Sequence, residues 1–386
     1  MQPRDPIAAV THADPDAYLD LLARTPGLRR DDALGLWVAA DAAAVAAVFD
    51  APQARVRPAG EAVPAAIAGT PAGALFSRLV RMNDGERHRA PKQVIERALA
   101  AVPAAQVQAC ARRLAAVDAA DMGRPERLGD WAMDTPVATV AALLGWGDDA
   151  AREVAAWVRD FVACLSPLST PEALKGASVA ADELTALARS LLQSADPQAL
   201  ACTVRAGAAE AGWSDEPALV ANLVGLLSQT CEATAGLVGN AIVALARRPW
   251  LLAEVRAMPQ GWDALVHETS RHDAPVQNTR RFIAEATTIG GVALAAGDAV
   301  LLVLAAANRD PALNPEPQRF RLDRPDRRVV TFGRGVHACP GQALAVRIAA
   351  AALQALFERW PGGAPAPLAW TYRASVNARI PVFRRA

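Results

Sequence analysis

The most chemically suggestive stretch of this chain, TFGRGVHACPGQ at 331–342, contains one cysteine. Cys339 follows a glycine-rich turn and directly precedes Pro340, and proline is well tolerated in the first turn of a helix. The sequence therefore predicts that Cys339 lies at or just before the start of a helix that begins near Pro340. Free N–H groups and the positive end of the helix dipole favour a thiolate there. Such a thiolate can serve as a nucleophile, a redox thiol or a metal ligand; the alternative is a buried structural cysteine.

The other cysteines predict no second site. The chain has five cysteines in 386 residues, and the remaining four are Cys110, Cys164, Cys202 and Cys231. They form no CxxC pair and no zinc-ligand spacing. An odd number of scattered cysteines also argues against a disulfide framework.

The segment FGRGVHACPG at 332–341 resembles the haem-binding loop of the cytochrome P450 superfamily. That loop reads Phe-Gly-x-Gly-x-(His/Arg)-x-Cys-x-Gly, and every fixed position is matched here. The resemblance implies that Cys339 is the proximal thiolate ligand of the iron in haem b, with Phe332 and Gly333 in the same cofactor-binding loop. It further implies an oxidoreductase, a haem-thiolate monooxygenase of the soluble bacterial type.

The resemblance also implies partners for the haem propionates, which need cationic or hydrogen-bonding groups. In ERHRAPK, His88 and Lys92 are four residues apart on a predicted helix and match the family's His-x-x-x-Arg position, with lysine in place of arginine. Arg281 and His337 match the other usual contacts, and Arg280 competes with Arg281 for this role. Taken alone, a side chain such as His88 or Arg281 would be interpreted as an ordinary surface residue.

A structural network is expected behind the haem. HETSR at 267–271 matches the family's Glu-x-x-Arg element, and Glu268 and Arg271, three residues apart, can pair on one helix face. PEPQRF at 315–320 matches a downstream Pro-x-x-Phe-type segment, so the resemblance implies that Arg319 completes a buried Glu-Arg-Arg network. Without the resemblance, the Glu268–Arg271 pair would be interpreted as a solvated salt bridge.

A long helix is predicted from about 215 to 247. SDEP at 214–217 supplies an N-cap serine, acids and an early proline, and ARRPW at 246–250 supplies arginines and a proline at the far end. The helix is apolar on all sides except at its centre, SQTCEAT at 228–234. Polar groups within a buried helix are costly unless they are hydrogen-bonded or face a cavity.

The resemblance gives this polar centre a role, because the family's central helix crosses the distal haem face and usually reads (Ala/Gly)-Gly-x-(Asp/Glu)-Thr. Aligned on the acid Glu232, the chain has Ala233 in place of the usual threonine, and Gln229 and Thr230 in place of the small pair. The missing alcohol normally helps deliver protons during O2 activation. Three explanations remain open: Thr234 substitutes after a slight helix shift, a substrate hydroxyl with water takes the role (the one we favour), or the chemistry is diverted, as in phenol coupling or peroxide-driven oxidation. Thr234 can alternatively hydrogen-bond to the helix carbonyl four residues earlier.

These residues must be positioned by a mainly α fold with a minor β lobe. The expected architecture is a single cytochrome P450 domain over 1–386, with haem between the long central helix and the cysteine loop. β-rich portions are predicted at about 30–60, 275–306 and 370–386, and helices almost continuously from 84 to 272 and again at 340–360. Residues 52–80, rich in Pro, Gly and Ala, are predicted to form a long irregular loop.

The substrate pocket is expected to draw on the loop at about 55–80, the segment 160–180, helix residues 225–234 and the start of a strand at 275–279. The candidate lining residues are Gly225, Gln229, Thr230 and Val276, with the apolar Val63, Ile67, Phe76, Leu79, Val162 and Leu165. They favour a medium-sized, partly apolar small molecule with a hydroxyl or amide, of a kind found in secondary metabolism.

The chain contains no evident flavin or iron–sulfur segment, so electrons are expected from a separate ferredoxin or flavodoxin with its reductase. Basic side chains expected to dock an acidic partner are Arg87, Arg89, Arg97, Arg112, Arg113, Arg334 and Arg347. A formal net charge of zero argues against nucleic acid or an anionic membrane as the main partner. Without a signal-peptide pattern or a run of membrane-span length, a soluble, cytoplasmic monomer is predicted. The alternatives are a peroxide-driven haem enzyme and a non-catalytic haem-binding or recruitment module.

Overall fold

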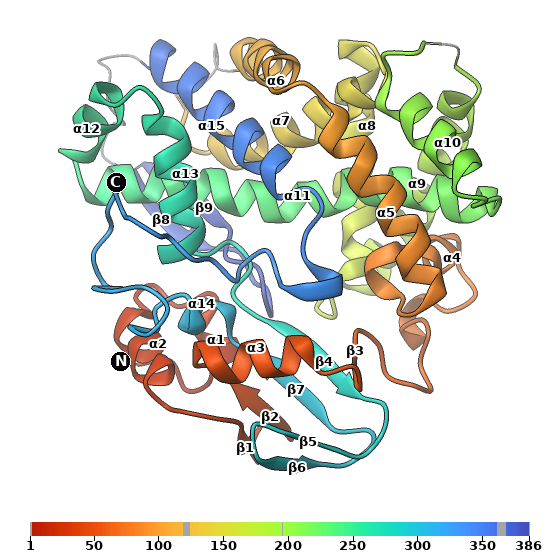
Figure 1. The fold of residues 1–386 in the computed structure, drawn as a ribbon. Helices are drawn as coiled ribbons and strands as arrows, with labels where there is room; N and C mark the ends of the chain where they lie inside the picture. The colour runs from red at the N-terminus through yellow and green to blue at the C-terminus, as the bar shows by residue number, and fades with distance from the viewer. Residues whose placement is uncertain (1, 119–123, 195, 361–367, 386) are drawn as a thin grey trace. The chain divides into compact units, whose positions relative to one another are not determined.

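Helices make up most of the computed structural model, which describes residues 2–118, 124–194, 196–360 and 368–385 (Figure 1). The chain divides into two compact units, each assembled from separate stretches of sequence. Unit 1 consists of Met1–Ala62, Gly239–Cys339 and Trp370–Val382, and unit 2 of Val63–Val238, Pro340–Ala369 and Phe383–Ala386.

Unit 1 is built on a five-stranded sheet with the strand order β1-β2-β7-β4-β3. The strands are β1 (Arg29–Asp31), β2 (Leu36–Ala39), β7 (Ala299–Leu302), β4 (Thr279–Ile283) and β3 (Ala54–Arg55). β2 and β7 are parallel, with Trp37 opposite Val300, and the other pairs are antiparallel. The hairpin of β5 (Thr287–Ile289) and β6 (Val292–Leu294) turns at Gly290 and Gly291, whose positive φ values suit a two-residue turn.

The central strand β7 contributes to an apolar cluster on each face of the sheet. Val300 and Leu302 join a cluster that includes residues of α3 (Ala42–Asp50). Leu301 joins a second cluster with residues of α2 (Asp16–Ala23). Successive side chains of a strand point to opposite faces, so a strand buried on both sides reads as the continuous apolar run AVLL. The remaining helices of unit 1 are α1 (Pro6–Ala9), α12 (Leu251–Ala257), α13 (Gly261–His272) and α14 (Leu304–Ala307).

Unit 2 is a helical assembly. Its helices are α4 (Pro71–Arg78), α5 (Glu86–Ala101), α6 (Ala104–Asp118), α7 (Arg127–Leu144), α8 (Asp148–Phe161), α9 (Pro171–Leu192), α10 (Leu200–Glu210) and α15 (Gln342–Arg359), with the 3₁₀ turns η1 (Ala65–Ile67), η2 (Val80–Met82) and η4 (Val162–Leu165). Helix α15 packs against α6 and α7, α8 packs against α7 and α9, and α5 packs against α10. The C-terminal strands β8 (Leu368–Tyr372) and β9 (Pro381–Arg385) form a separate two-stranded sheet.

The long helix α11 (Glu216–Arg247) matches the predicted one, and its 32 residues correspond to a length of about 48 Å. Its N-terminus differs from the prediction in one respect. The side chain that accepts a hydrogen bond from the first turn, from the N–H of Ala218 at 3.0 Å, belongs to Asp215 rather than to the predicted Ser214.

The prediction of one irregular loop over 52–80 is wrong, because this stretch contains the eight-residue helix α4. The Thr70 side chain accepts a hydrogen bond from the N–H of Gly73, and Pro71 occupies the first helical position. A threonine cap followed by proline is a helix-start signal, and the high Gly and Pro content around it obscured that signal.

Among the residues that the structure describes, one helical stretch, Gly335–Arg359, is long and apolar enough to cross a membrane by length and composition. Core helices of globular proteins pass the same test. The residues of α15 within this stretch include an almost unbroken buried run from Ile348 to Phe357, which packs within unit 2.

Candidate functional site

The cysteine loop is a tight turn that presents its thiol to solvent. Cys339 is exposed, whereas Cys110, Cys164 and Cys231 are buried and Cys202 is half-buried. The structure therefore contradicts the alternative of a buried structural cysteine at 339. Helix α15 begins at Gln342, two residues later than predicted, so Cys339 precedes the helix rather than starting it.

Backbone hydrogen bonds close this turn. The N–H of Cys339 donates to the carbonyl of Phe332 at 2.7 Å, and the N–H of Gly333 donates to the carbonyl of Val330 at 2.8 Å. Gly333 has a φ of +72°, and a Cβ there would lie 3.1 Å from the carbonyl oxygen of His337. Glycine at 333 therefore allows the turn to adopt a conformation that side chains disfavour.

Side chains from neighbouring elements anchor the base of the loop. The Thr331 hydroxyl donates to the carbonyl of Ser270 on α13 at 2.7 Å and accepts from the Asn308 side chain at 2.7 Å. The side-chain amide oxygen of Asn308 in turn accepts from the N–H of Val330 at 2.8 Å. The sequence prediction missed Asn308 and Thr331, which carry no distinctive spacing, although they connect the cysteine loop to the helix that bears Glu268 and Arg271.

The predicted pairing of Glu268 with Arg271 is confirmed. Both side chains are 0% exposed, and a guanidinium nitrogen of Arg271 lies 2.6 Å from the Glu268 carboxylate. Burial alone would raise the pKa of Glu268. The hydrogen bonds and charge of Arg271, with further bonds from the Arg321 N–H and from Arg327, outweigh that effect and hold the pKa below its ordinary value.

The prediction that the side chain of Arg319 completes this network is wrong. Its guanidinium is 69% exposed and pairs with Glu316 at 2.7 Å. The arginines that reach Glu268 are Arg324, at 3.1 Å, and Arg327, at 2.8 Å. Arg319 takes part through its carbonyl oxygen, which accepts from Arg271 at 3.0 Å and from Arg324 at 2.6 Å.

The physical reason lies in the residue after Arg319. Phe320 is buried and packs edge-on against the ring of His272 at 5.5 Å, with the Arg248 guanidinium 4.8 Å from its ring. Burial of Phe320 leaves the adjacent arginine facing solvent. The segment DRPDR at 323–327 carried the missed arginines, but its spacing alone did not distinguish them from surface charges.

Strand β4 carries two neighbouring arginines that differ in burial. Arg280 is exposed, while Arg281 is buried, its guanidinium lying 5.0 Å from the Phe49 ring and donating to the carbonyl of Arg280. Adjacent strand residues face opposite ways, so only Arg281 is directed into the protein. Of the other predicted residues in unit 1, His337 is half-buried, and Val276, which bridges to Ala378, is half-buried against the core.

The two predicted propionate contacts of α5 are both buried, and one has a fixed orientation. His88 lies with its Nδ1 2.9 Å from the carbonyl of Val80, so Nδ1 carries a proton and donates it. Lys92 lies one turn further along, with its ammonium 3.4 Å from Glu96. Two basic side chains on one face of α5 match the donor set that a carboxylate requires.

Between positions 219 and 245 of α11, every described residue is buried except Leu226, Gln229, Thr230, Glu232 and Ala233. Residues 226, 229, 230 and 233 follow helical spacing, so they form one accessible stripe, with Glu232 at its edge. We call these five residues the α11 stripe.

Residues of the stripe hydrogen-bond within their own helix. The Thr230 hydroxyl donates to the carbonyl of Leu226 at 2.7 Å, and the Gln229 amide donates to the carbonyl of Gly225 at 2.9 Å. A Cβ at Gly225 would lie 3.0 Å from Leu79 Cδ2 and 3.1 Å from Gln229 Nε2, so glycine there makes room for both side chains. Thr234 lies outside the stripe and is 2% exposed.

The predicted site residues are divided between the units. Unit 1 carries Val276, Arg281, Phe332, Gly333, His337 and Cys339 as well as the Glu268 network; unit 2 carries His88, Lys92, Gly225, Gln229, Thr230, Glu232, Ala233 and Thr234. Among the described residues, no group of three or more His, Cys, Asp or Glu side chains could hold a metal ion. A single exposed thiol suits a metal that arrives with its other ligands already in place, as the iron of a porphyrin does.

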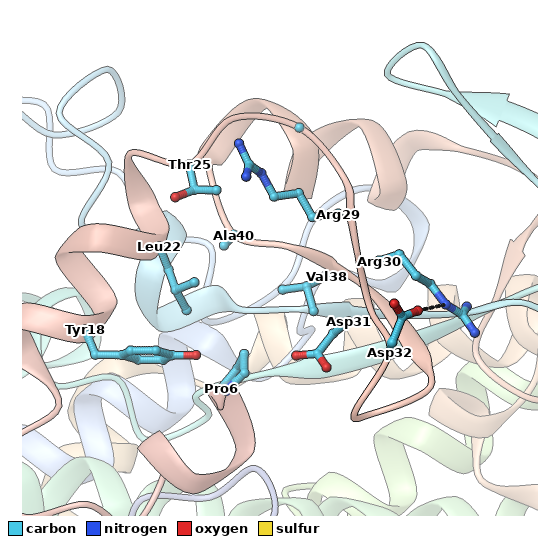
Figure 2. A pocket seen from close by; sticks show the side chains of 11 residues that line it. Pro6, Tyr18, Leu22, Thr25, Arg29, Arg30, Asp31, Asp32, Val38 and Ala40 are labelled. Carbon is cyan, nitrogen blue, oxygen red and sulfur yellow. Dashed lines mark ion pairs between the residues drawn. The ribbon is translucent and has the colours of Figure 1, made fainter. Parts of the chain in front are cut away.

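Unit 1 also has a surface pocket of about 340 Å³, lined by none of the predicted site residues (Figure 2). Its walls include the apolar Leu22 and Val38, the Tyr18 ring and Asp31. Burial, together with the charges of Asp5 and Asp31, raises the pKa of Tyr18 to about 12. Its hydroxyl is therefore protonated at neutral pH, and the pocket offers no group poised for the predicted chemistry.

Comparisons with known proteins agree on one family. Residues 252–360 match the family model described as Cytochrome P450. The chain is 34% identical over 246 residues to Cytochrome P450 144 of Mycobacterium tuberculosis, covering 63% of this chain and 57% of that protein. It is 31% identical over 245 residues to 6-deoxyerythronolide B hydroxylase of Saccharopolyspora erythraea, covering 62% of this chain and 59% of that enzyme. The chain thus matches less than two thirds of the length of these curated relatives.

A solved structure extends the likeness over the whole fold. The structure of Mycobacterium smegmatis CYP164A2 superposes with a TM-score of 0.78 at 26% identity, covering 97% of this chain and 96% of that one.

Proposed function

Because the chain belongs to the cytochrome P450 family, whose cofactor is haem b, we propose that it is a haem-thiolate monooxygenase acting on a small organic molecule. The observation that carries this proposal is the exposed thiol of Cys339 on a closed glycine turn. When bound, haem supplies the O2-activating chemistry. Similarity to 6-deoxyerythronolide B hydroxylase supports a hydroxylation in secondary metabolism.

The Cys339 thiolate would bind the iron, and the turn between Phe332 and Cys339 fixes the position of that residue. His88, Lys92, Arg281 and His337 are the basic side chains that would serve the propionates. Since the Nδ1–H of His88 donates to the carbonyl of Val80, a bond from its Nε2 to a carboxylate requires the imidazolium form.

Proton delivery is assigned to the α11 stripe. The carboxyl group of Glu232 serves as the proton donor. Because residue 233 is alanine, the hydroxyl that the family usually carries next to this carboxyl group is missing. We propose that a substrate hydroxyl, with water, occupies that position. Gln229 and Thr230 then act as polar contacts for the substrate.

Electrons are proposed to come from a separate ferredoxin or flavodoxin with its reductase, and the protein to act as a monomer in the cytoplasm. Four of the arginines that we assign to docking already form exposed ion pairs: Arg89 with Glu86, Arg112 with Glu358, Arg113 with Asp148 and Arg334 with Asp50. Such exposed pairs hold each guanidinium weakly, so an acidic partner can compete for it.

The test is the carbon monoxide spectrum of the reduced protein after Cys339→Ser. The wild type should show the Soret position of thiolate-ligated haem, and the variant should lose it. Cys202→Ser is the matched control, because Cys202 is half-buried in another part of the fold and should leave the spectrum unchanged. An unchanged spectrum in the Cys339 variant would refute the ligand assignment. Turnover with ferredoxin and reductase, compared with turnover with hydrogen peroxide alone, distinguishes the monooxygenase from a peroxide-driven enzyme. Absence of turnover under both conditions indicates a non-catalytic haem protein.

A further inference from the structure

Asn222 lies on the same face of α11 as the α11 stripe, one turn before it. It precedes Leu226 by four residues and Gln229 by seven, a spacing that places all three on one side of a helix. Leu226 and Gln229 are half-buried, whereas Asn222 is 3% exposed. Another element therefore covers this face of the helix where the stripe ends.

The covering element is η2 together with the two residues before it. The side-chain oxygen of Asn222 accepts from the N–H of Val80 at 2.8 Å, and its nitrogen donates to the carbonyl of Arg78 at 3.0 Å. A second donor bond, to the carbonyl of Ala218 at 2.8 Å, holds the amide against its own helix. The peptide groups on both sides of Leu79 are thus fixed to α11 by one side chain.

Leu79 is the residue that these bonds place against the stripe. It is 0% exposed, and its Cδ2 would lie 3.0 Å from a Cβ at Gly225. The side-chain nitrogen of Gln229 would lie 3.1 Å from the same Cβ. Leu79 and a polar residue of the stripe therefore share the space that Gly225 leaves free.

Helix α5 and Asn83 hold the same segment through its carbonyls. The Nδ1–H of His88 donates to the carbonyl of Val80 at 2.9 Å, and the Asn83 amide donates to the carbonyl of Leu79 at 2.8 Å. Val80 is 7% exposed, so water does not readily replace a bond that its N–H loses. Within unit 2, this segment is therefore fixed to α11 on one side and to α5 on the other.

We propose that Asn222 is a positioning residue, which holds Leu79 at the end of the α11 stripe as a boundary of the substrate site. This inference rests on the proposed function and specifies how its substrate site is bounded. A carboxamide carries an acceptor and two donors on one planar group, so it can bind a carbonyl and an N–H on either side of one residue. Leucine, which is similar in size, would leave the buried N–H of Val80 without an acceptor.

The test compares two azoles that differ by one apolar ring, imidazole and 4-phenylimidazole. Each is titrated into the ferric haem-loaded protein and followed by the shift of the Soret band. The phenyl ring adds apolar contact, so 4-phenylimidazole should bind the wild type more tightly than imidazole. Asn222→Leu should lower the ratio of the two affinities about fivefold or more, because the boundary is no longer preorganised. Leu79→Ala should lower this ratio as well, and the double variant no further than the larger single effect, since Asn222 acts through Leu79.

Asn240→Leu is the matched control. Asn240 lies on α11, is 1% exposed, and its amide donates to the carbonyls of Asp273 at 2.8 Å and Arg379 at 3.2 Å. The same substitution there also leaves buried carbonyls without a donor, so it should lower the urea midpoint. It should keep the affinity ratio within about twofold of the wild-type value, because the partners of Asn240 belong to unit 1.

The outcomes separate this inference from the proposed function. The inference is overturned if Asn222→Leu keeps the wild-type ratio, if its effect adds to that of Leu79→Ala, or if Asn240→Leu lowers the ratio equally. If Asn222→Leu takes up no haem, Asn222→Asp is measured in its place. That variant keeps an oxygen for the N–H of Val80 but loses the amide donors, so a lowered ratio supports the inference and an unchanged ratio overturns it. Absence of the thiolate signature in the wild type would overturn the proposed function itself, whereas a wild-type thiolate signature with an unaltered ratio in Asn222→Leu would overturn only the role of Asn222.

Discussion

Replacing Arg324 by alanine should destabilise the protein much more than replacing Arg319. The Arg324 side chain is 3% exposed, and its Nε lies 3.1 and 3.3 Å from the two oxygens of Glu268. Its other nitrogens donate to the carbonyls of Pro315, Glu316 and Arg319. The Arg319 side chain is 69% exposed and pairs with a half-exposed Glu316.

The contacts set the expected magnitudes. Removing one partner of a buried ion pair costs about 3–5 kcal/mol, because the remaining charge stays buried. Glu268 keeps Arg271 and Arg327 in the variant, which reduces that cost. The three carbonyls that lose a donor add about 1 kcal/mol each. We therefore expect a loss of about 3–5 kcal/mol for Arg324→Ala, against about 0–1 kcal/mol for Arg319→Ala, whose ion pair is exposed.

Urea unfolding of the ferric holoprotein, followed by helical circular dichroism, measures both free energies. Arg319→Ala is the matched control, since it removes a guanidinium five residues away in the same loop. The reasoning is refuted if the two variants lose the same free energy of unfolding. It is also refuted if Arg319→Ala proves the more destabilising of the two.

Two further predictions follow from the same structure. The folded-state pKa of Glu268 lies below its ordinary value of 4.5, so the stabilising contribution of the carboxylate is present above that pH and is lost as pH falls through the folded-state pKa. The urea midpoints of wild type and Glu268→Gln should therefore converge between pH 7 and the most acidic pH at which both proteins fold. A difference between the midpoints that stays constant with pH would contradict this. Thr234→Val should keep the rate of product formation, and the share of electrons recovered in product, within about twofold of the wild-type values. Loss of a positioned proton donor would instead lower the rate of product formation about a hundredfold or more. Ala233→Thr, which adds a hydroxyl to the α11 stripe, should change that share, and a large effect of Thr234→Val alone would show that Thr234 is catalytic.

Much of the fold was predictable because local signals agreed with tertiary burial. The apolar run of β7, the glycine pair of the β5–β6 hairpin and the capped ends of α11 each have one favourable local structure. Prediction failed at α4, where a Thr-Pro cap lies among helix-breaking residues. The pairing of β2 with β7 could not be predicted from the sequence either, because parallel strands far apart in the sequence share no local pattern.

The cysteine loop was predictable because its glycines and Cys339 occupy fixed spacings. The network at Glu268 was only half predictable. The i, i+3 spacing on α13 predicts that Arg271 pairs with Glu268. The loop at 311–330 has no helical or strand periodicity from which the inward-facing arginines could be predicted. Burial of Phe320 decides that Arg319 faces outward, and this depends on His272 and Arg248, which are distant in sequence.

Helix geometry separates the explanations for the missing threonine. A step of one residue along an α-helix rotates a side chain by about 100°. Ala233 lies on the accessible α11 stripe, while Thr234 shares the buried side with Leu227 and Cys231, both 0% exposed. Bringing Thr234 onto the stripe requires a rotation that would expose those side chains, which is far more than a slight shift. The Thr230 hydroxyl, on the stripe, already donates to the carbonyl of Leu226 and keeps only acceptor capacity. Within the stripe, therefore, Glu232 is the titratable group, and this supports our proposal that the hydroxyl beside it comes from the substrate or from water.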